Sequence, residues 1–282
     1  MLITPSANPL GAGFGAGPSA MFRTVWHHRS LIARLAKREL VARYQGSLLG
    51  MLWAVINPLL MLGVYTFVFT TVFQARWGTG EGGSPQFALL LFSGLILFTI
   101  LSDCVSRAPG LLLENASYIK KVVFPLEILP VVVLTVALAN AGIGLVILLL
   151  FHLLFLGLPP ATVLLLPLVI LPLSLMALGL SWFLSSAGVF LRDIRQVVGV
   201  GITVLMFLSP IFYPVSAVPE RFRLFIHLNP LTPILEQSKD LLFWGRIPSL
   251  VDWGLVTLAA WVIAWLGYAW FTKTRRGFAD VV

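Results

Sequence analysis

The chain has 282 residues, of which 59% are hydrophobic and 11% charged, and its mean hydropathy is +0.96. A soluble globular protein carries about 25% charged residues, so this chain has too little polar material to cover a water-exposed surface. Its richness in aliphatic and aromatic residues excludes a disordered chain. Long unbroken apolar runs favour membrane helices over a β-barrel, in whose strands of about ten residues apolar and polar side chains alternate. The composition therefore predicts an all-α integral membrane protein.

The net charge of +8 has a simple interpretation in such a protein. An excess of Lys and Arg is expected in the cytoplasmic loops of a membrane protein, so we expect no nucleic-acid partner. The single cysteine, Cys104, forms no disulfide within the chain, and the four histidines are scattered. We therefore expect no metal site.

Six apolar segments are predicted to span the membrane, because a hydrocarbon core of about 30 Å needs about 20 helical residues. No Asp, Glu, Lys or Arg occurs between Ile128 and Leu191, and Gly157–Pro160 divides this run into two spans. The six predicted spans are approximately 50–74, 86–108, 126–156, 161–190, 197–213 and 251–272.

The distribution of basic residues orients these spans. Of the 19 Lys and Arg residues, 14 fall on the side that holds both termini. The positive-inside rule therefore predicts a multi-pass protein with both termini in the cytoplasm. Residues 1–22 are rich in Gly, Pro and Ala and lack the basic region of a secretory signal, so we expect a flexible N-terminal tail.

Residues 30–43 are predicted to form an amphipathic helix. Ile32, Leu35, Ala36 and Leu40 fall on one face, and the opposite face is strongly basic. Such a helix can lie in the membrane interface among anionic headgroups. Alternatively, a cytosolic partner docks against the same basic face.

Residues 111–121 are predicted to form a second cytoplasmic helix beyond the second span. Its polar residues do not suit the centre of a bilayer, and apolar side chains frame them. This composition favours a docking surface, although an ordinary loop remains the alternative.

The segment 214–243 is too apolar for a solvated loop and too broken for a full span. We expect two short helices, separated at Asn229-Pro230, that dip part of the way into the membrane from outside. Irregular backbone at membrane depth needs protein or a water-filled cavity around it, which indicates an outer gate. The candidate gate residues are Pro210, Tyr213, Pro214, Pro219, Asn229 and Pro230.

The chain lacks the motifs of an enzyme. It has no GxxxxGK[ST] phosphate loop and no convergent set of catalytic residues. Asp103 and Arg107 are four residues apart and are expected to pair along one helix. Any energy for transport must therefore come from another polypeptide.

Four separated stretches resemble the permease subunits of ABC-2-type polysaccharide exporters. They are RELVARYQGSLLGMLWAVINPLL (38–60), NASYIKKVVFPLEILP (115–130), the region 192–243 that begins RDIRQVVGVG, and FTKTRRGFADVV (271–282). The resemblance covers residues 25–282, and it implies that 23–282 form the transmembrane domain. It is greatest to the O-antigen branch of the family, which exports polysaccharide on undecaprenyl pyrophosphate. Permeases for capsule, teichoic acid or a small hydrophobic solute are the alternatives, and a membrane enzyme of lipid or glycan assembly is the alternative from another class.

The resemblance implies an assembly in the bacterial inner membrane. Two copies of the chain would form the channel, and two ABC ATPase subunits would dock below it. ATP and Mg²⁺ would bind the ATPase subunits, and this chain would hold no cofactor. The interface and coupling residues would be Arg34, Lys37, Arg38, Glu39, Glu114, Asn115, Tyr118, Lys120 and Lys121.

Two further sets of residues are predicted to contact the substrate. Aromatic faces stack on sugar rings, and the candidates in the first span are Trp53, Tyr65, Phe69 and Phe73, the last three on one helical face. A lipid-facing stripe is the alternative. Near the cytoplasmic interface, the lipid pyrophosphate is predicted to meet Arg34, Arg38 and Arg43.

Overall fold

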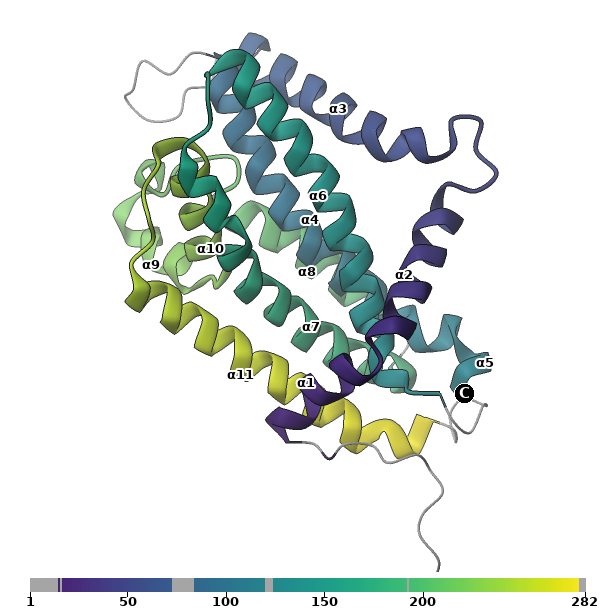
Figure 1. Ribbon diagram of the computed structural model, residues 1–282. Helices are drawn as coiled ribbons and strands as arrows, with labels where there is room; N and C mark the ends of the chain where they lie inside the picture. The colour runs from purple at the N-terminus through teal and green to yellow at the C-terminus, as the bar shows by residue number, and fades with distance from the viewer. Residues whose placement is uncertain (1–14, 16, 73–83, 120–123, 192, 279–282) are drawn as a thin grey trace, which may run out of the picture.

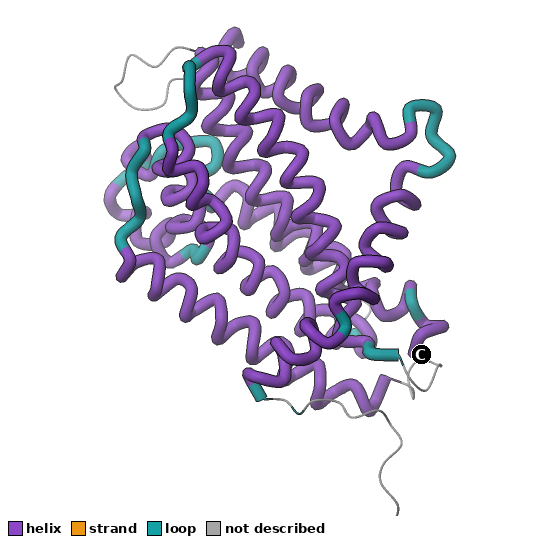
Figure 2. Tube along the Cα trace, viewed as in Figure 1, coloured by secondary structure: helices purple, strands orange, loops and turns teal. Residues whose placement is uncertain are grey.

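The structure, a computed structural model, describes residues 15, 17–72, 84–119, 124–191 and 193–278. Within this part of the chain every regular element is a helix, and short loops join the helices (Figure 2). Among the described residues, five helices are long and apolar enough to cross a membrane, which confirms an all-α membrane protein. In chain order they are Gly50–Phe69, Pro85–Glu114, Leu126–Phe155, Ala161–Phe190 and Leu250–Gly277.

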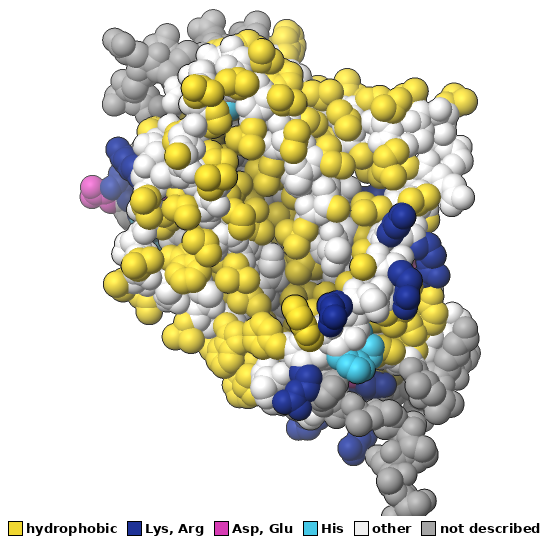
Figure 3. All heavy atoms as spheres, in the orientation of Figure 1, with side chains coloured by type: hydrophobic (Ala, Val, Ile, Leu, Met, Phe, Trp, Pro, Cys, Tyr) yellow, Lys and Arg dark blue, Asp and Glu magenta, His cyan; other side chains and the backbone are white. Residues whose placement is uncertain are grey.

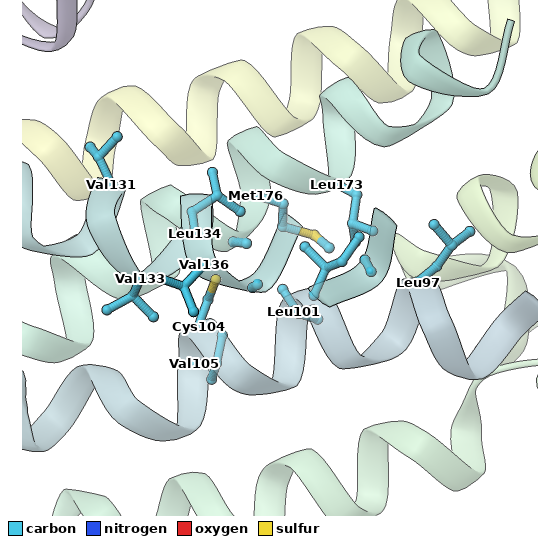
Figure 4. Close-up of a cluster of buried hydrophobic side chains, with 14 of the residues drawn as sticks. Leu97, Leu101, Cys104, Val105, Val131, Val133, Leu134, Val136, Leu173 and Met176 are labelled. Carbon is cyan, nitrogen blue, oxygen red and sulfur yellow. The ribbon is translucent and has the colours of Figure 1, made fainter. Parts of the chain in front are cut away.

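Helix α4 (Ser84–Glu114) lies at the centre of the bundle. It packs against α6 (Leu129–Phe155), which follows the short turn η3 (Leu126–Ile128), and against α7 (Leu166–Phe190), which follows η4 (Ala161–Leu165). Figure 4 shows the apolar side chains that these three helices bring together. The labelled members of this core are Leu97, Leu101, Cys104, Val105, Val131, Val133, Leu134, Val136, Leu173 and Met176.

Helix α3 (Trp53–Thr66) is the least enclosed of the long helices. It follows η1 (Gly50–Leu52) and continues as the π-helix η2 (Phe67–Val72). Within the protein, 11% of its apolar stretch is buried, against 78% for the central helix α4. In Figure 1, α3 meets α4 near one end and leans away from it towards α2. Most of the α3 surface must therefore be covered by lipid or by another protein chain.

The predicted fifth span is shorter than expected. Helix α8 (Ile194–Leu208) has 15 residues, equivalent to about 22 Å, so it is less than the thickness of the hydrocarbon core. The prediction placed its end at residue 213, but the backbone becomes extended at Ser209 and a proline follows. The number of membrane crossings therefore stays a prediction.

Helices α7 and α11 (Leu250–Thr274) approach each other backbone to backbone. A Cβ added at Gly179 would lie 2.4 Å from the carbonyl oxygen of Ile263, and one at Gly267 would lie 2.0 Å from the carbonyl oxygen of Gly179. Small residues commonly allow such close approach in membrane helices, where packing rather than exclusion of water drives association.

A proline inside α7 has its lost hydrogen bond replaced. Pro172 has no N–H to donate to the carbonyl of Leu168 one turn earlier. The indole N–H of Trp253, on α11, donates to this carbonyl at 2.9 Å. The neighbouring helix thus satisfies the freed carbonyl, as membrane helices require.

One end of the bundle, here called the basic end, holds α1 (Pro18–His27), α2 (Arg29–Tyr44), α5 (Ala116–Ile119) and the C-terminal end of α11 (Figure 1). Lys and Arg side chains gather over α1 and α2 on the face shown in Figure 3. The Thr24 and Tyr268 hydroxyls are 3.0 Å apart, which ties α1 to α11. Arg275 forms an ion pair with the buried Glu127, whose carbonyl also accepts a hydrogen bond from Trp182 at 2.9 Å.

Helix α1 corrects one prediction. The flexible tail was expected to extend to residue 22, but α1 begins at Pro18, and Ala20 and Met21 are buried. Pro18 occupies the first turn, where its missing N–H costs no hydrogen bond. The rest of the expected tail lies almost entirely outside the described residues.

The glycine contact between α7 and α11 generates a prediction. A Gly267→Ala change places a methyl group against the α7 backbone, which should lower the free energy of unfolding by about 1–3 kcal/mol. We therefore expect the apparent melting temperature to fall by several degrees. Gly254, on the same helix, has open space around it and provides a matched control. Gly254→Ala should leave the melting temperature unchanged or raise it, because alanine favours a helix. Thermal unfolding of the detergent-solubilised protein measures both, and equal melting temperatures for the two variants would contradict the packing argument.

Candidate docking and translocation surfaces

Helix α2 presents a basic face and packs through the opposite one. Ile32 and Ala36 are buried, and Leu35 and Leu40 pack against the core, mostly along α6. The charged side chains of the basic face are exposed: Arg34, Lys37 and Arg38. The predicted division of this helix into an apolar and a basic face is confirmed. The basic face is therefore open to a partner or to lipid headgroups.

Two ion pairs hold α2 against α4. Arg107 forms an ion pair with Glu39, and Arg43 Nη1 lies 3.7 Å from Asp103 Oδ2. Glu39 and Arg43 are four residues apart on α2, as Asp103 and Arg107 are on α4. One pair has its acidic residue on α2, and the other has its acidic residue on α4. The predicted pairing of Asp103 with Arg107 along one helix is therefore wrong, because α2 supplies a partner of opposite charge to each.

The predicted coupling helix 111–121 is divided between two elements. Helix α4 continues to Glu114, and α5 begins at Ala116. The side chain of Asn115, between them, donates to the carbonyl of Leu111 at 2.9 Å. A single helix over 111–121 is therefore a wrong prediction, since the chain turns at Asn115. Lys120 and Lys121 lie outside the described residues.

This turn connects the predicted interface helix to the predicted coupling element. Arg38, on α2, donates from Nη2 to the hydroxyl of Tyr118, on α5, at 3.0 Å. Glu114 lies 3.4 Å from Arg195, near the start of α8. Thus α2, the end of α4, α5 and the start of α8 meet at the basic end.

A groove of about 560 Å³ lies between α3 and the pair α4 and α6. Trp53 and Tyr65, two of the predicted aromatic contacts, line it, and so do Arg43 and Asp103. Of the three arginines predicted to meet a lipid pyrophosphate, Arg43 is in this groove, whereas Arg34 and Arg38 lie on the exposed face of α2.

Two residues of the expected aromatic stripe on the first span have different neighbours, and their contact with sugar stays a prediction. Tyr65 faces the groove, but Phe69 stacks near Phe87 and Phe212, with ring centroids 5.8 and 6.1 Å away. Phe73 lies outside the described residues.

The predicted outer segment contains two short helices, as expected. Helices α9 (Glu220–Leu228) and α10 (Leu231–Lys239) meet at Asn229 and Pro230, and α10 continues as the π-helix η6 (Asp240–Trp244). Asn229 accepts a hydrogen bond from the Leu231 N–H at 3.0 Å. Pro214 and Pro219 flank the turn η5 (Val215–Ala217) before α9.

The end of α8 is held by side chains from this outer segment. Asn229 Nδ2 donates to the Ser209 hydroxyl at 2.9 Å, and Lys239 Nζ donates to the Pro210 carbonyl at 2.5 Å. The hydroxyl of Tyr213 donates back to the carbonyl of Phe207 at 2.8 Å. Three of the predicted gate residues, Pro210, Tyr213 and Asn229, thus lie at the point where α8 stops, although a gating role stays a prediction.

Lys239 is a residue that the sequence analysis missed. Its side chain is buried, and burial lowers the pKa of its ammonium group to about 7, while the nearby Glu236 carboxylate opposes this shift. The sequence offered one weak signal of this burial: Lys239 stands shortly before Leu241 and Leu242, both of which are buried. Burial of this ammonium group requires an internal partner, which the structure shows to be the Pro210 carbonyl.

The fold and these surfaces define a helical membrane protein of the transporter type, and comparisons with known proteins identify its family. The model of the ABC-2 type transporter family matches residues 30–243. The chain therefore belongs to the ABC-2 type transporter family.

Relatives with an assigned function are similar to this protein over almost its whole chain. The O-antigen export system permease protein RfbA of Myxococcus xanthus is 28% identical over 93% of this chain and 99% of its own length. A protein of the same name from Klebsiella pneumoniae is 26% identical over 89% of this chain and 95% of its own. The polysialic acid transport protein KpsM of Escherichia coli is 22% identical over 87% of this chain and 93% of its own length.

The two ion pairs between α2 and α4 generate a second prediction. Glu39→Arg or Arg107→Glu alone places like charges together, so each should lower the stability of the protein by about 1 kcal/mol, since these side chains are about one-third exposed. The double variant restores opposite charges and should recover more than half of the loss in apparent melting temperature. Arg34→Glu, an exposed change on the same helix, serves as the control. A double variant as unstable as the sum of the single variants would exclude the pairing.

Proposed function

We propose that this chain is the membrane-spanning permease subunit of an ATP-driven exporter of lipid-linked polysaccharide. The substrate that we propose is O-antigen on undecaprenyl pyrophosphate, moved from the cytoplasm to the periplasm across the bacterial inner membrane. One observation carries this proposal: the similarity to RfbA of Myxococcus xanthus, named as an O-antigen export permease, spans 99% of that protein. Capsular polysaccharide is the second candidate substrate, and the similarity to KpsM supports it.

The ATP that drives export is proposed to bind, with Mg²⁺, to two copies of a separate ABC ATPase subunit. The ABC-2 match supports such a partner. We propose that the partner docks at the basic end, against the exposed residues of α2 and against α5. The hydrogen bond from Arg38 to Tyr118 and the contact of Glu114 with Arg195 would then transmit its motion to α4 and α8. This orientation puts both termini in the cytoplasm, which the positive charge of that end supports.

The channel is proposed to form between two copies of this chain. The exposed apolar surface of α3 supports this arrangement, because one copy leaves most of that helix uncovered. α8 also exposes apolar side chains, among them Val197, Val200 and Phe207. The proposed channel would offer aromatic faces to sugars, and the exposed Arg34 and Arg38 would meet the pyrophosphate of the carrier at the cytoplasmic surface.

Purification from the native membrane tests this function. The tagged protein, solubilised in a mild detergent, should carry with it an ATPase that has a phosphate loop, at one-to-one stoichiometry. Deleting the gene should also remove a surface polysaccharide, and chemical analysis of the glycan lost would distinguish O-antigen from capsule. A stable preparation without an ATPase in several detergents would instead favour a membrane enzyme of lipid or glycan assembly.

The proposed coupling surface generates a third prediction. Glu114→Lys puts a cation against Arg195, so we expect the protein to insert normally while surface polysaccharide falls by roughly tenfold. Glu220→Lys is a matched control, because Glu220 is also exposed and ion-paired but belongs to α9. Immunoblotting of membranes measures insertion, and extraction of surface glycan measures export. Normal export by the Glu114 variant would show that this contact does not take part in coupling.

A further inference from the structure

The groove beneath α3 is charged at one end and apolar at the other. Along α4 its lining passes from Asp103 to Thr99, then to Ile96 and Phe92, with about one turn between successive positions. Arg43 is at the Asp103 end, with its guanidinium 3.7 Å from that carboxylate. The lining therefore changes from charged to polar to apolar over about 17 Å of helix.

Helix α6 repeats this gradient. Gly144 lies against Ile96, since a Cβ added at Gly144 would be 3.1 Å from that side chain. Because α4 and α6 run in opposite directions, Asn140, one turn before Gly144, is level with Thr99, one turn after Ile96 (Figure 1). The Asn140 Oδ1 atom is buried, and no residue in the described part of the chain hydrogen-bonds to it. Because this oxygen is buried and can only accept, the group of Asn140 that can meet a ligand in the groove is its amide N–H, which would donate to an acceptor oxygen at this level.

We propose that the groove binds one anionic glycerophospholipid of the surrounding bilayer. Its phosphate lies at Arg43, at the basic end. Its ester carbonyls lie at the side-chain amides of Asn57 and Asn140 and near the indole N–H of Trp53. An acyl chain follows the apolar floor of the groove past Met61 and Phe92. Each part of the lipid thereby meets groove residues of matching polarity.

The polar residues between the arginine and the apolar floor favour a glycerophospholipid over a polyprenyl phosphate. In a glycerophospholipid, the ester groups lie directly beyond the phosphate and accept hydrogen bonds. A polyprenyl phosphate is hydrocarbon from the phosphate onward, so it would bury the amides of Asn57 and Asn140 against carbon. Burying an amide without a hydrogen bond is unfavourable, so this ligand fits the middle of the groove poorly.

The anionic headgroup follows from the setting of Arg43. Its ion pair with Asp103 is long, and the two side chains are 43% and 35% exposed, so the pair contributes little stability. A phosphate can therefore replace Asp103 as the partner of Arg43 and form charge-assisted hydrogen bonds with the guanidinium. The Asp103 carboxylate opposes an anionic lipid, which predicts opposite effects for changes at Arg43 and at Asp103.

Native mass spectrometry of the full-length, delipidated protein in a mild detergent tests the proposal, with dioleoyl phosphatidylglycerol as the probe. Arg43→Gln should weaken binding about five-fold, the effect of one cation near an anionic headgroup. Asp103→Asn should strengthen binding, and Asn57→Leu, an exposed change that keeps the groove filled, should weaken it. Arg34→Gln is the matched control, since Arg34 is an exposed arginine of the same helix that does not line the groove.

Two outcomes would overturn the proposal. Equal weakening by Arg43→Gln and Arg34→Gln would show diffuse attraction to the basic face of α2 rather than a site. Displacement of phosphatidylglycerol by an equimolar amount of undecaprenyl phosphate would assign the groove to a polyprenyl lipid instead. Size-exclusion chromatography of every variant confirms that it is folded, and Asp103→Asn keeps the test informative because its expected effect is a gain of binding.

Discussion

The arrangement of this protein depends on backbone contact between helices at α7. Glycines let α7 touch α11 at Gly179 and Gly267, and a Cβ added at Gly188 would lie 2.2 Å from the carbonyl oxygen of Pro109 on α4. In a bilayer, lipid tails are as apolar as leucine, so close packing supplies the attraction that exclusion of water supplies in soluble proteins. The bundle of α4, α6, α7 and α11 is consequently tight, whereas α3 remains at its edge with little of its surface enclosed.

This division also distinguishes how firmly the helices are held. The helices of the bundle pack tightly, and α2 with α3 is attached to them through fewer contacts, among them the ion pairs of Glu39 with Arg107 and of Arg43 with Asp103. Exposed ion pairs are weak individually and can be exchanged without disrupting the apolar core. Elements held in this way can exchange contacts between alternative packings at little cost in free energy. The groove beneath α3 lies at the boundary between the two parts.

Local patterns in the sequence predicted much of this architecture. The long run without charged residues, broken at Gly157–Pro160, predicted the apolar spans Leu126–Phe155 and Ala161–Phe190 almost to the residue, because helix breakers and apolar length are local properties. The break at Asn229-Pro230 separated α9 from α10 for the same reason. The sequence patterns failed where partners come from elsewhere in the chain. Spacing alone paired Asp103 with Arg107, and it did not indicate that Lys239 is buried against the Pro210 carbonyl.

The sequence by itself determined the class of protein, because composition fixes which solvent the surface must meet. It also determined the helices, the two-faced character of α2 and, through motifs in a constant order, the resemblance to exporter permeases. Only the tertiary structure decided which charges pair, where α8 stops, and that Tyr65 lines a groove while Phe69 packs near Phe87 and Phe212. It also decided that Arg43, Asn57 and Asn140 line one groove. These features depend on distances between helices far apart in the chain, and such distances are set by packing rather than by local spacing.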